Sequence, residues 1–167
     1  LLERDKDYKD KLIPEFLSNW VYEGKQYGMP LYVTKTLLFL NKTMMKEAGI
    51  DKNPESFDEM MAQAEKMTGP GKSGFMTLNF DWLYWPLFKM NGIDFANADM
   101  TKAAFNTPEA VALVKQLADL TAKGVIDKIS WTGRWVEPNG AFAAGTVGML
   151  HAHAPAYLWF KSKGEWV

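Results

Sequence analysis

The stretch Gly140–His153, with the sequence Gly-Ala-Phe-Ala-Ala-Gly-Thr-Val-Gly-Met-Leu-His-Ala-His, contains two local patterns in direct succession. Residues 140–145 are small apart from Phe142 and favour a short helix. Val147–His153 is apolar for most of its length and predicts a buried strand. A helix that leads directly into a buried strand is a building unit of α/β domains.

The same alternation extends outward toward the N-terminus. Thr36–Leu40 is apolar throughout and predicts a strand buried on both faces, and Phe75–Leu78 predicts a second short buried strand. Helices are expected over residues 41–49, 56–68, 82–90, 107–123 and 155–163. Strands that alternate with helices predict the α/β class, with a short sheet covered by helices.

Several of these helices carry local signals. Ser56 and Glu59 form a capping-box pattern, and Thr107 followed by Pro108 is typical of a helix start. We expect Pro86 to lie early enough in its helix that the missing N–H costs little. The helix after Thr107 is predicted to bury a stripe made of Val111, Leu113, Val114, Leu117 and Leu120.

The first 34 residues differ in character from the rest. Residues 1–23 combine mixed charge with helical spacing and predict a peripheral helical lead-in, interrupted near Pro14. Residues 24–34 follow a turn signal and are expected to form a hinge or crossover strand. This strand and Thr36–Leu40 are predicted as two extended pieces joined at residues 30–34, because Pro30 cannot donate within a central strand.

Composition excludes several classes of protein. The 167 residues include 19 basic and 20 acidic side chains, and the net charge of -1 argues against nucleic-acid binding. No apolar run approaches the ~20 residues of a membrane span. The chain has no cysteine, which excludes disulfides and thiol nucleophiles. It begins at Leu1 without Met or a signal peptide, so we expect a fragment of a longer protein.

Catalytic and metal-binding patterns are weak. There is no nucleophile elbow, phosphate loop or zinc-binding helix motif. The two histidines, His151 and His153, share one predicted strand face and lack nearby partner ligands, so we expect no metal and no cofactor. Asp81 and Asp94 leave a glycoside hydrolase as an alternative, which requires the two carboxyls to face each other about 5 to 10 Å apart.

Aromatic side chains provide the strongest binding signal. They gather beside polar residues at predicted strand-to-helix junctions and loops, where open α/β sheets bind ligands. Flat rings next to carboxylates, amides and imidazoles suit a sugar, whose C–H faces stack while its hydroxyls form hydrogen bonds. Trp82 and Trp135 are expected in the cleft, whereas Trp85 and Trp159 are expected in the core. The predicted ligand-binding residues are Asp81, Trp82, Tyr84, Trp131, Arg134, Trp135, His153 and Tyr157.

Seven segments, in order, resemble a known family. They are residues 24–30, 38–42, 48–50, 54–59, 85–92, 105–110 and 141–149. Together they are similar to the extracellular solute-binding proteins of ABC importers, in the sugar-binding branch that contains maltose-binding protein. No single segment is specific for this family, but the occurrence of all seven in the family's order over residues 24–153 is specific.

The resemblance implies one lobe of a two-lobed clamshell of the periplasmic-binding-protein type. Residues 35–153 would form most of the C-terminal lobe, Met29, Pro30 and Leu31 the hinge, and residues 154–167 a helix after the return strand. Trp82 corresponds to an aromatic that stacks on sugar in the family. After the third strand the usual Gly and Trp are replaced, so Tyr157 or His153 is expected as the second platform.

The resemblance also implies partners and a location. A sugar would bind between this lobe and a missing N-terminal lobe, and the closed form would meet a membrane permease. The protein would lie outside the cytoplasm, either in the periplasm or as a cell-surface lipoprotein. The apolar surface left by the missing lobe predicts self-association of the fragment. Arg134 keeps a non-sugar solute, such as a phosphorylated polyol or a peptide, as an alternative ligand.

Overall fold

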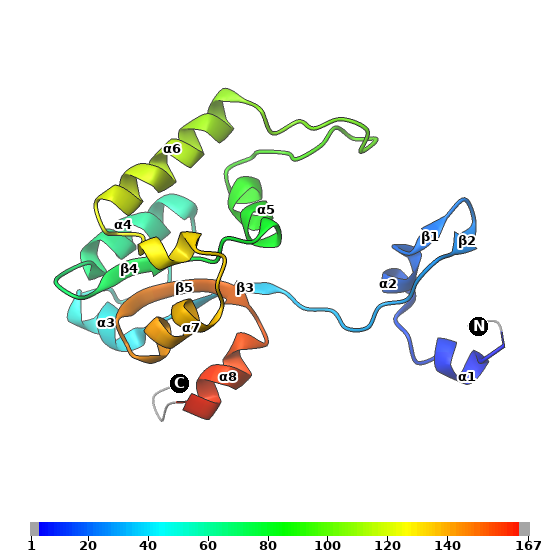
Figure 1. Cartoon of the computed structure of the whole chain (residues 1–167), viewed down its shortest axis with the longest axis horizontal. Helices are drawn as coiled ribbons and strands as arrows, with labels where there is room; N and C mark the ends of the chain where they lie inside the picture. Colours follow the sequence, from blue (N-terminus) through cyan, green and yellow to red (C-terminus); the bar gives the residue numbers. More distant parts are fainter. Residues whose placement is uncertain (1–3, 164–167) are drawn as a thin grey trace. The chain divides into compact units, whose positions relative to one another are not determined.

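The computed structural model describes residues 4–163 and divides the chain into two compact units, residues 1–34 and residues 35–167 (Figure 1). Each unit has its own secondary structure and is described by itself. The second unit contains the sheet and both hydrophobic cores, so it carries the candidate site.

A three-stranded sheet forms the centre of the second unit. Its strands are β3 (Thr36–Leu40), β4 (Ser73–Met76) and β5 (Val147–His153), in the order β3-β5-β4. β3 runs antiparallel to β5, with Thr36 opposite His153, and β4 runs parallel to β5. The α/β class is confirmed, although β4 begins and ends two residues earlier than predicted.

Helices cover both faces of this sheet (Figure 1). The helices are α3 (Lys42–Glu47), α4 (Phe57–Met67), α5 (Asp81–Met90), α6 (Pro108–Ala122), the 3₁₀ helix η1 (Lys128–Trp131), α7 (Val136–Ala143) and α8 (Ala156–Lys163). One core packs against α3, α4 and α6, and the other packs against α7 and α8, while α5 contributes to both. Neighbouring residues of β3 point to opposite cores: Leu38 and Leu40 pack on the first and Phe39 on the second.

Two glycines let α4 lie close to the sheet. A Cβ atom on Gly74 would stand 1.8 Å from the backbone oxygen of Ala64 in α4. A Cβ atom on Gly148 of β5 would stand 2.8 Å from the sulfur of Met67. Both strands therefore depend on the absence of a side chain at the point where the helix crosses them.

Side-chain caps fix the helix starts that the sequence predicts. The Ser56 hydroxyl accepts from the Glu59 N–H at 3.1 Å, and the Thr107 hydroxyl accepts from the Ala110 N–H at 3.2 Å. The Glu59 carboxylate completes the first cap by accepting from the Glu55 N–H, one residue before the usual capping-box donor.

Three expectations about the helices are wrong. Val111 and Val114 are 62% and 52% exposed, because the buried stripe of α6 is narrower than predicted and consists of Ala110, Leu113, Leu117 and Leu120. α7 begins at Val136, four residues before the predicted start. Pro86 is the sixth residue of α5, beyond the first turn, so it cannot donate the helical hydrogen bond to the Trp82 carbonyl.

The first unit is a small helical and hairpin segment. It contains α1 (Lys6–Lys9), α2 (Pro14–Ser18) and a hairpin of β1 (Val21–Tyr22) and β2 (Lys25–Gln26). Glu23 and Gly24 turn the hairpin with positive φ angles of 47° and 72°. Residues 27–35 contain no regular strand, so the first predicted extended piece forms a strand only at Lys25–Gln26, whereas the second, Thr36–Leu40, is β3 and pairs with β5.

Across residues 4–163, none of the helices combines the length and the apolar character needed to cross a bilayer.

Candidate functional site

The candidate site lies at the edge of the sheet where β4 and β5 both end. Because these strands are parallel, the residues that follow β4 meet His153 at the end of β5. Asn79 and Phe80 follow β4, and α5 begins directly after them at Asp81. This is the edge at which ligands bind in open α/β sheets.

Two hydrogen bonds attach the η1 segment to this edge. The Ser130 hydroxyl accepts from the Thr77 N–H at 3.2 Å, and both residues are buried. The Asn79 side-chain amide donates to the Trp131 carbonyl at 3.2 Å. The chain from η1 to α7, which carries Trp131 and Trp135, is thereby held beside the start of α5.

Four rings form an aromatic cluster at this edge: Phe80, Trp82, Trp135 and His153. The ring centroids of Phe80 and Trp135 lie 4.3 Å apart, those of Trp82 and Trp135 lie 5.5 Å apart, and both pairs are stacked. The His153 ring meets Trp135 edge-on at 5.0 Å and Trp82 edge-on at 5.9 Å. Three of the predicted binding residues therefore lie together, although they are separated by up to 71 positions in the sequence.

The cluster is accessible from solvent. The Trp135 side chain is 39% exposed, and Phe80, Trp82 and His153 are half-buried. Phe80 is absent from the predicted set of ligand-binding residues, yet it makes the shortest ring contact in the cluster. Phe80 lies directly before Asp81 and Trp82 and shortly after a buried strand, and this position could have placed it among the predicted ligand-binding residues.

A second group consists of Asn79, Tyr84 and Trp131. The Tyr84 hydroxyl donates to the Asn79 side-chain oxygen at 2.8 Å, and the rings of Tyr84 and Trp131 stack at 6.5 Å. The Trp131 indole N–H donates to the Thr121 hydroxyl at 3.0 Å. The polar atoms of Tyr84 and Trp131 thus already have protein partners, and partial burial raises the pKa of Tyr84.

The remaining predicted binding residues carry charge or lie apart. Asp81 is exposed at the start of α5, where its carboxylate accepts from the Trp82 N–H at 2.9 Å. The Arg134 guanidinium pairs with the Glu137 carboxylate at 2.7 Å, and this pairing lowers the Glu137 pKa. Tyr157 is 46% exposed on α8, and no ring contact within residues 4–163 connects it to the aromatic cluster.

The two histidines occupy different environments. His151 is buried, its Nδ1 atom lies 3.4 Å from the Thr77 hydroxyl, and burial lowers its pKa to about 4. The His153 pKa is also lowered by burial. Within residues 4–163 the buried Nδ1 atom of His153 has no hydrogen-bond partner. Both imidazoles are therefore neutral near pH 7.

The carboxylate pair required by the hydrolase alternative is not assembled. Asp81 is the first residue of α5, whereas Asp94 follows its C-terminal end and pairs with Lys89. A helix of this length separates its ends by about 15 Å. That distance exceeds the separation at which two carboxyls act on one glycosidic bond.

Trp85 corrects a prediction about the core. It is 52% exposed, and its one ring contact within residues 4–163 is edge-on to Phe95, because it occupies the outer face of α5. Trp159 is half-buried and packs against the second core, as expected.

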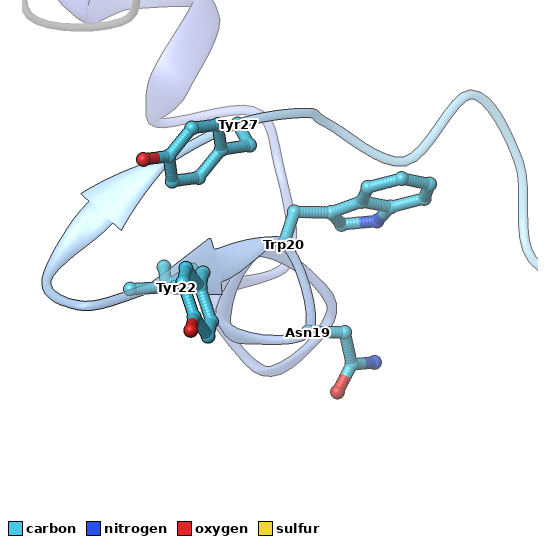
Figure 2. Close-up of a pocket in the computed structure, with 5 residues that line it drawn as sticks. Asn19, Trp20, Tyr22 and Tyr27 are labelled. Carbon is cyan, nitrogen blue, oxygen red and sulfur yellow. The ribbon is translucent and has the colours of Figure 1, made fainter.

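A separate hollow of about 350 Å³ lies in the first unit, beside the hairpin (Figure 2). Figure 2 shows the Trp20 ring directed away from those of Tyr22 and Tyr27. Tyr22 and Tyr27 are 67% and 69% exposed, so the hollow is an open surface feature. It is lined by Asn19, Trp20, Val21, Tyr22 and Tyr27.

Comparison with known proteins identifies the family. A family model described as bacterial extracellular solute-binding protein matches residues 1–164. This chain belongs to that family. The resemblance seen in the sequence is therefore confirmed.

Three curated relatives show how much of the family's length is covered. A binding protein of Brucella abortus is 30% identical over 86% of this chain and 36% of its own length. The sn-glycerol-3-phosphate-binding periplasmic protein of Brucella abortus is 28% identical over 77% of this chain and 31% of its own length. The arabinooligosaccharide-binding protein of Halalkalibacterium halodurans is 27% identical over 66% of this chain and 25% of its own length. The chain spans about a third of the length of these relatives.

Solved structures share the fold. A solute-binding protein of Agrobacterium radiobacter in complex with ribitol has a TM-score of 0.82 and 20% identity, covering 99% of this chain and 44% of its own. The maltose-bound MalE3 protein of T. maritima has a TM-score of 0.80 and 22% identity, covering 95% of this chain and 43% of its own. The arrangement of this chain is thus that of one lobe of a periplasmic-binding-protein-like fold.

Proposed function

We propose that this chain provides the C-terminal lobe of the substrate-binding component of an ABC importer, which binds a sugar or oligosaccharide between two lobes. The observation that carries the proposal is the aromatic cluster at the carboxyl edge of β4 and β5. Stacked, accessible rings bordered by a carboxylate and an imidazole suit the C–H faces and hydroxyls of a sugar.

In this proposal the predicted binding residues have different roles. Trp82 and Trp135 stack on sugar rings, and the half-buried His153 ring borders both of them edge-on and provides a polar contact beside the stacked sugar. Asp81 accepts hydrogen bonds through the carboxylate oxygen that does not face its own helix. Tyr84 and Trp131 support the cluster, Arg134 directly precedes Trp135 and provides a charged contact, and Tyr157 on α8 provides a contact away from the cluster.

Binding requires no covalent chemistry. A ligand that contacts both lobes stabilises the closed state by the difference between its affinities for the closed and open states. Met29, Pro30 and Leu31 lie in the irregular segment that joins the two units, and we assign the hinge rotation to them.

The partners follow from the family. The second lobe of the same protein completes the cleft, and the membrane permease of the importer receives the closed complex. The protein acts outside the cytoplasm, in the periplasm or as a cell-surface lipoprotein. Without its second lobe the chain is expected to self-associate, because large apolar side chains such as Leu31 and Tyr32 remain 93% and 71% exposed.

The test is a binding titration of the full-length protein with a panel of neutral sugars, followed by calorimetry. Trp82→Ala should weaken binding of the best sugar roughly tenfold or more, because it removes one stacking ring. Trp85→Ala is the matched control, since it lies on the same helix, makes no contact with the cluster and is 52% exposed. Equal affinities for both variants, or silence of the folded wild type across the panel, would contradict the proposal.

A second candidate ligand is a phosphorylated polyol. The sequence similarity to an sn-glycerol-3-phosphate-binding protein favours it, and Arg134 is the cation that directly precedes Trp135. An anion would have to compete with Glu137 for this guanidinium. Arg134→Ala should then reduce affinity for glycerol-3-phosphate far more than for a neutral sugar. An equal loss for both ligands would exclude this candidate.

A further inference from the structure

We infer that Trp135 determines specificity by limiting the length of the sugar chain that stacks on the aromatic cluster. This inference rests on the proposed function and deepens it, because it assigns to one ring of the cluster the role of selecting short sugar chains over long ones. The argument starts from the relative orientation of the three large rings.

The rings of Phe80, Trp82 and Trp135 are close to parallel. Phe80 and Trp82 are inclined by only 13° to one another, at a centroid distance of 5.7 Å. Trp135 stacks on both, inclined by 28° to Phe80 and by 24° to Trp82. The indole of Trp135 therefore covers ring surface that is itself flat and oriented for stacking.

Trp135 reaches this position from a different part of the chain. Phe80 and Trp82 flank the start of α5, whereas Trp135 is the residue immediately before α7. His153 borders the indole on one side through an edge-on contact at 5.0 Å. The ring faces of Phe80 and Trp82 that stack on Trp135 are covered by its indole and are closed to a sugar.

The contacts that hold the Trp135 side chain are ring contacts. In the described part of the chain its indole N–H donates no hydrogen bond, and the bond that its backbone carbonyl accepts from the Asn139 N–H does not involve the side chain. With the side chain 39% exposed, truncation leaves the start of α7 and its polar contacts intact. The indole thus reduces the ring surface on which a sugar can stack, and it is not needed to hold the backbone at the start of α7.

Removing the indole should lengthen the binding surface. Trp135→Ala exposes ring surface of Phe80 and Trp82, and one more sugar unit can stack there. We expect the ratio of the dissociation constant of a short ligand to that of a long ligand to rise about tenfold, the effect of one additional stacked ring.

The experiment is calorimetric titration of the full-length protein with two matched series of probes. The first series is arabinose and arabinotriose, and the second is maltose and maltotetraose. Trp135→Phe keeps a flat ring and should stay near the wild-type ratio, and Trp85→Ala should not change it. If Trp135→Ala does not fold, as judged by circular dichroism, Trp135→Leu provides the same readout because it also lacks a ring.

The outcomes separate this inference from the proposed function. A selective gain for the longer probe supports it. If Trp135→Ala weakens binding of the short and the long sugar equally, so that the ratio of their dissociation constants is unchanged, the inference is overturned. Trp135 is then a stacking ring without a role in length selection, and sugar binding itself remains established. If neither the wild type nor a folded variant binds any of the four probes, the inference and the proposed sugar function both fail.

Discussion

The aromatic cluster at the sheet edge and the aromatic hollow on the hairpin contain similar side chains in different settings. In the cluster, Phe80, Trp82 and Trp135 stack with inclinations of 13° to 28°. On the hairpin, Tyr22 and Tyr27 lie 6.4 Å apart and are tilted by 59°. Aromatic content alone therefore does not define the candidate site; the orientation of the rings does.

The difference originates in what lies beneath each group. The cluster is built by α5, the segment before α7 and β5, whose buried residues belong to two cores. The described part of the first unit contains one buried residue, Leu17. A supporting core fixes ring orientation, because a well-packed side chain is confined to one rotamer.

The largest expected effect is that of an added Cβ at Gly74, compared with the same change at Gly28 in the first unit. Gly74→Ala should destabilise the protein by about 3 kcal/mol or more, because the new atom meets the backbone of α4 at 1.8 Å. Gly28→Ala should change stability by less than about 0.5 kcal/mol, because its Cβ meets only the Trp20 side chain, which is 49% exposed. Urea unfolding measures both. Similar losses for the two variants would show that the first unit is packed as firmly as the second.

A pH-dependent effect of about 2 kcal/mol is expected from His151. Its pKa is near 4 when folded, below the ordinary value of 6.5, so the unfolded chain binds the proton more readily between these values. Stability should fall by about 2 kcal/mol as the pH drops from 7 to 5. His151→Gln should flatten that part of the profile in urea unfolding. An unchanged slope would mean that His151 does not control acid stability.

The smallest effect compares one ring from each aromatic group. Phe80→Ala should cost about 1.5 kcal/mol, because it removes a half-buried ring that packs on the second core. Tyr22→Ala should cost about 0.5 kcal/mol or less, since its ring is 67% exposed. Thermal unfolding of the two variants distinguishes the groups. If Tyr22→Ala is the more damaging change, the hairpin has a structural role that its exposure does not reveal.

Much of the second unit could be predicted from local sequence. Ser56 and Thr107 each cap a helix by a hydrogen bond to a residue three positions later, so these caps could be predicted without knowing the tertiary structure. Continuous apolar runs predicted the positions of β3 and β5. β5 is buried along almost all of its length, but the prediction that β3 is buried on both faces is wrong: β3 is an edge strand, it is only partly buried, and Leu37 is exposed. The shift of β4 by two residues reflects pairing with β5, which local pattern does not specify.

The candidate site was predictable in composition but not in detail. Trp82, Trp135 and His153 could be selected because each follows or precedes a predicted element at the expected edge. Which rings touch was not predictable, since Phe80 and Trp135 lie 55 positions apart and meet only in the folded chain. The exposure of Trp85 and of Val111 depends on how α5 and α6 are rotated about their axes relative to the core. Sequence periodicity predicts which residues of a helix face the core only to within about one position.

The hydrogen bond between the Ala154 N–H and the Lys35 carbonyl, 2.8 Å long, ties the entry of the second unit to the end of β5. It continues the ladder that pairs Thr36 with His153. If Met29, Pro30 and Leu31 rotate as we propose, the rotation reaches the backbone that follows His153 through this hydrogen bond. In this proposal the pairing of β3 with β5 couples lobe closure to the position of the aromatic cluster.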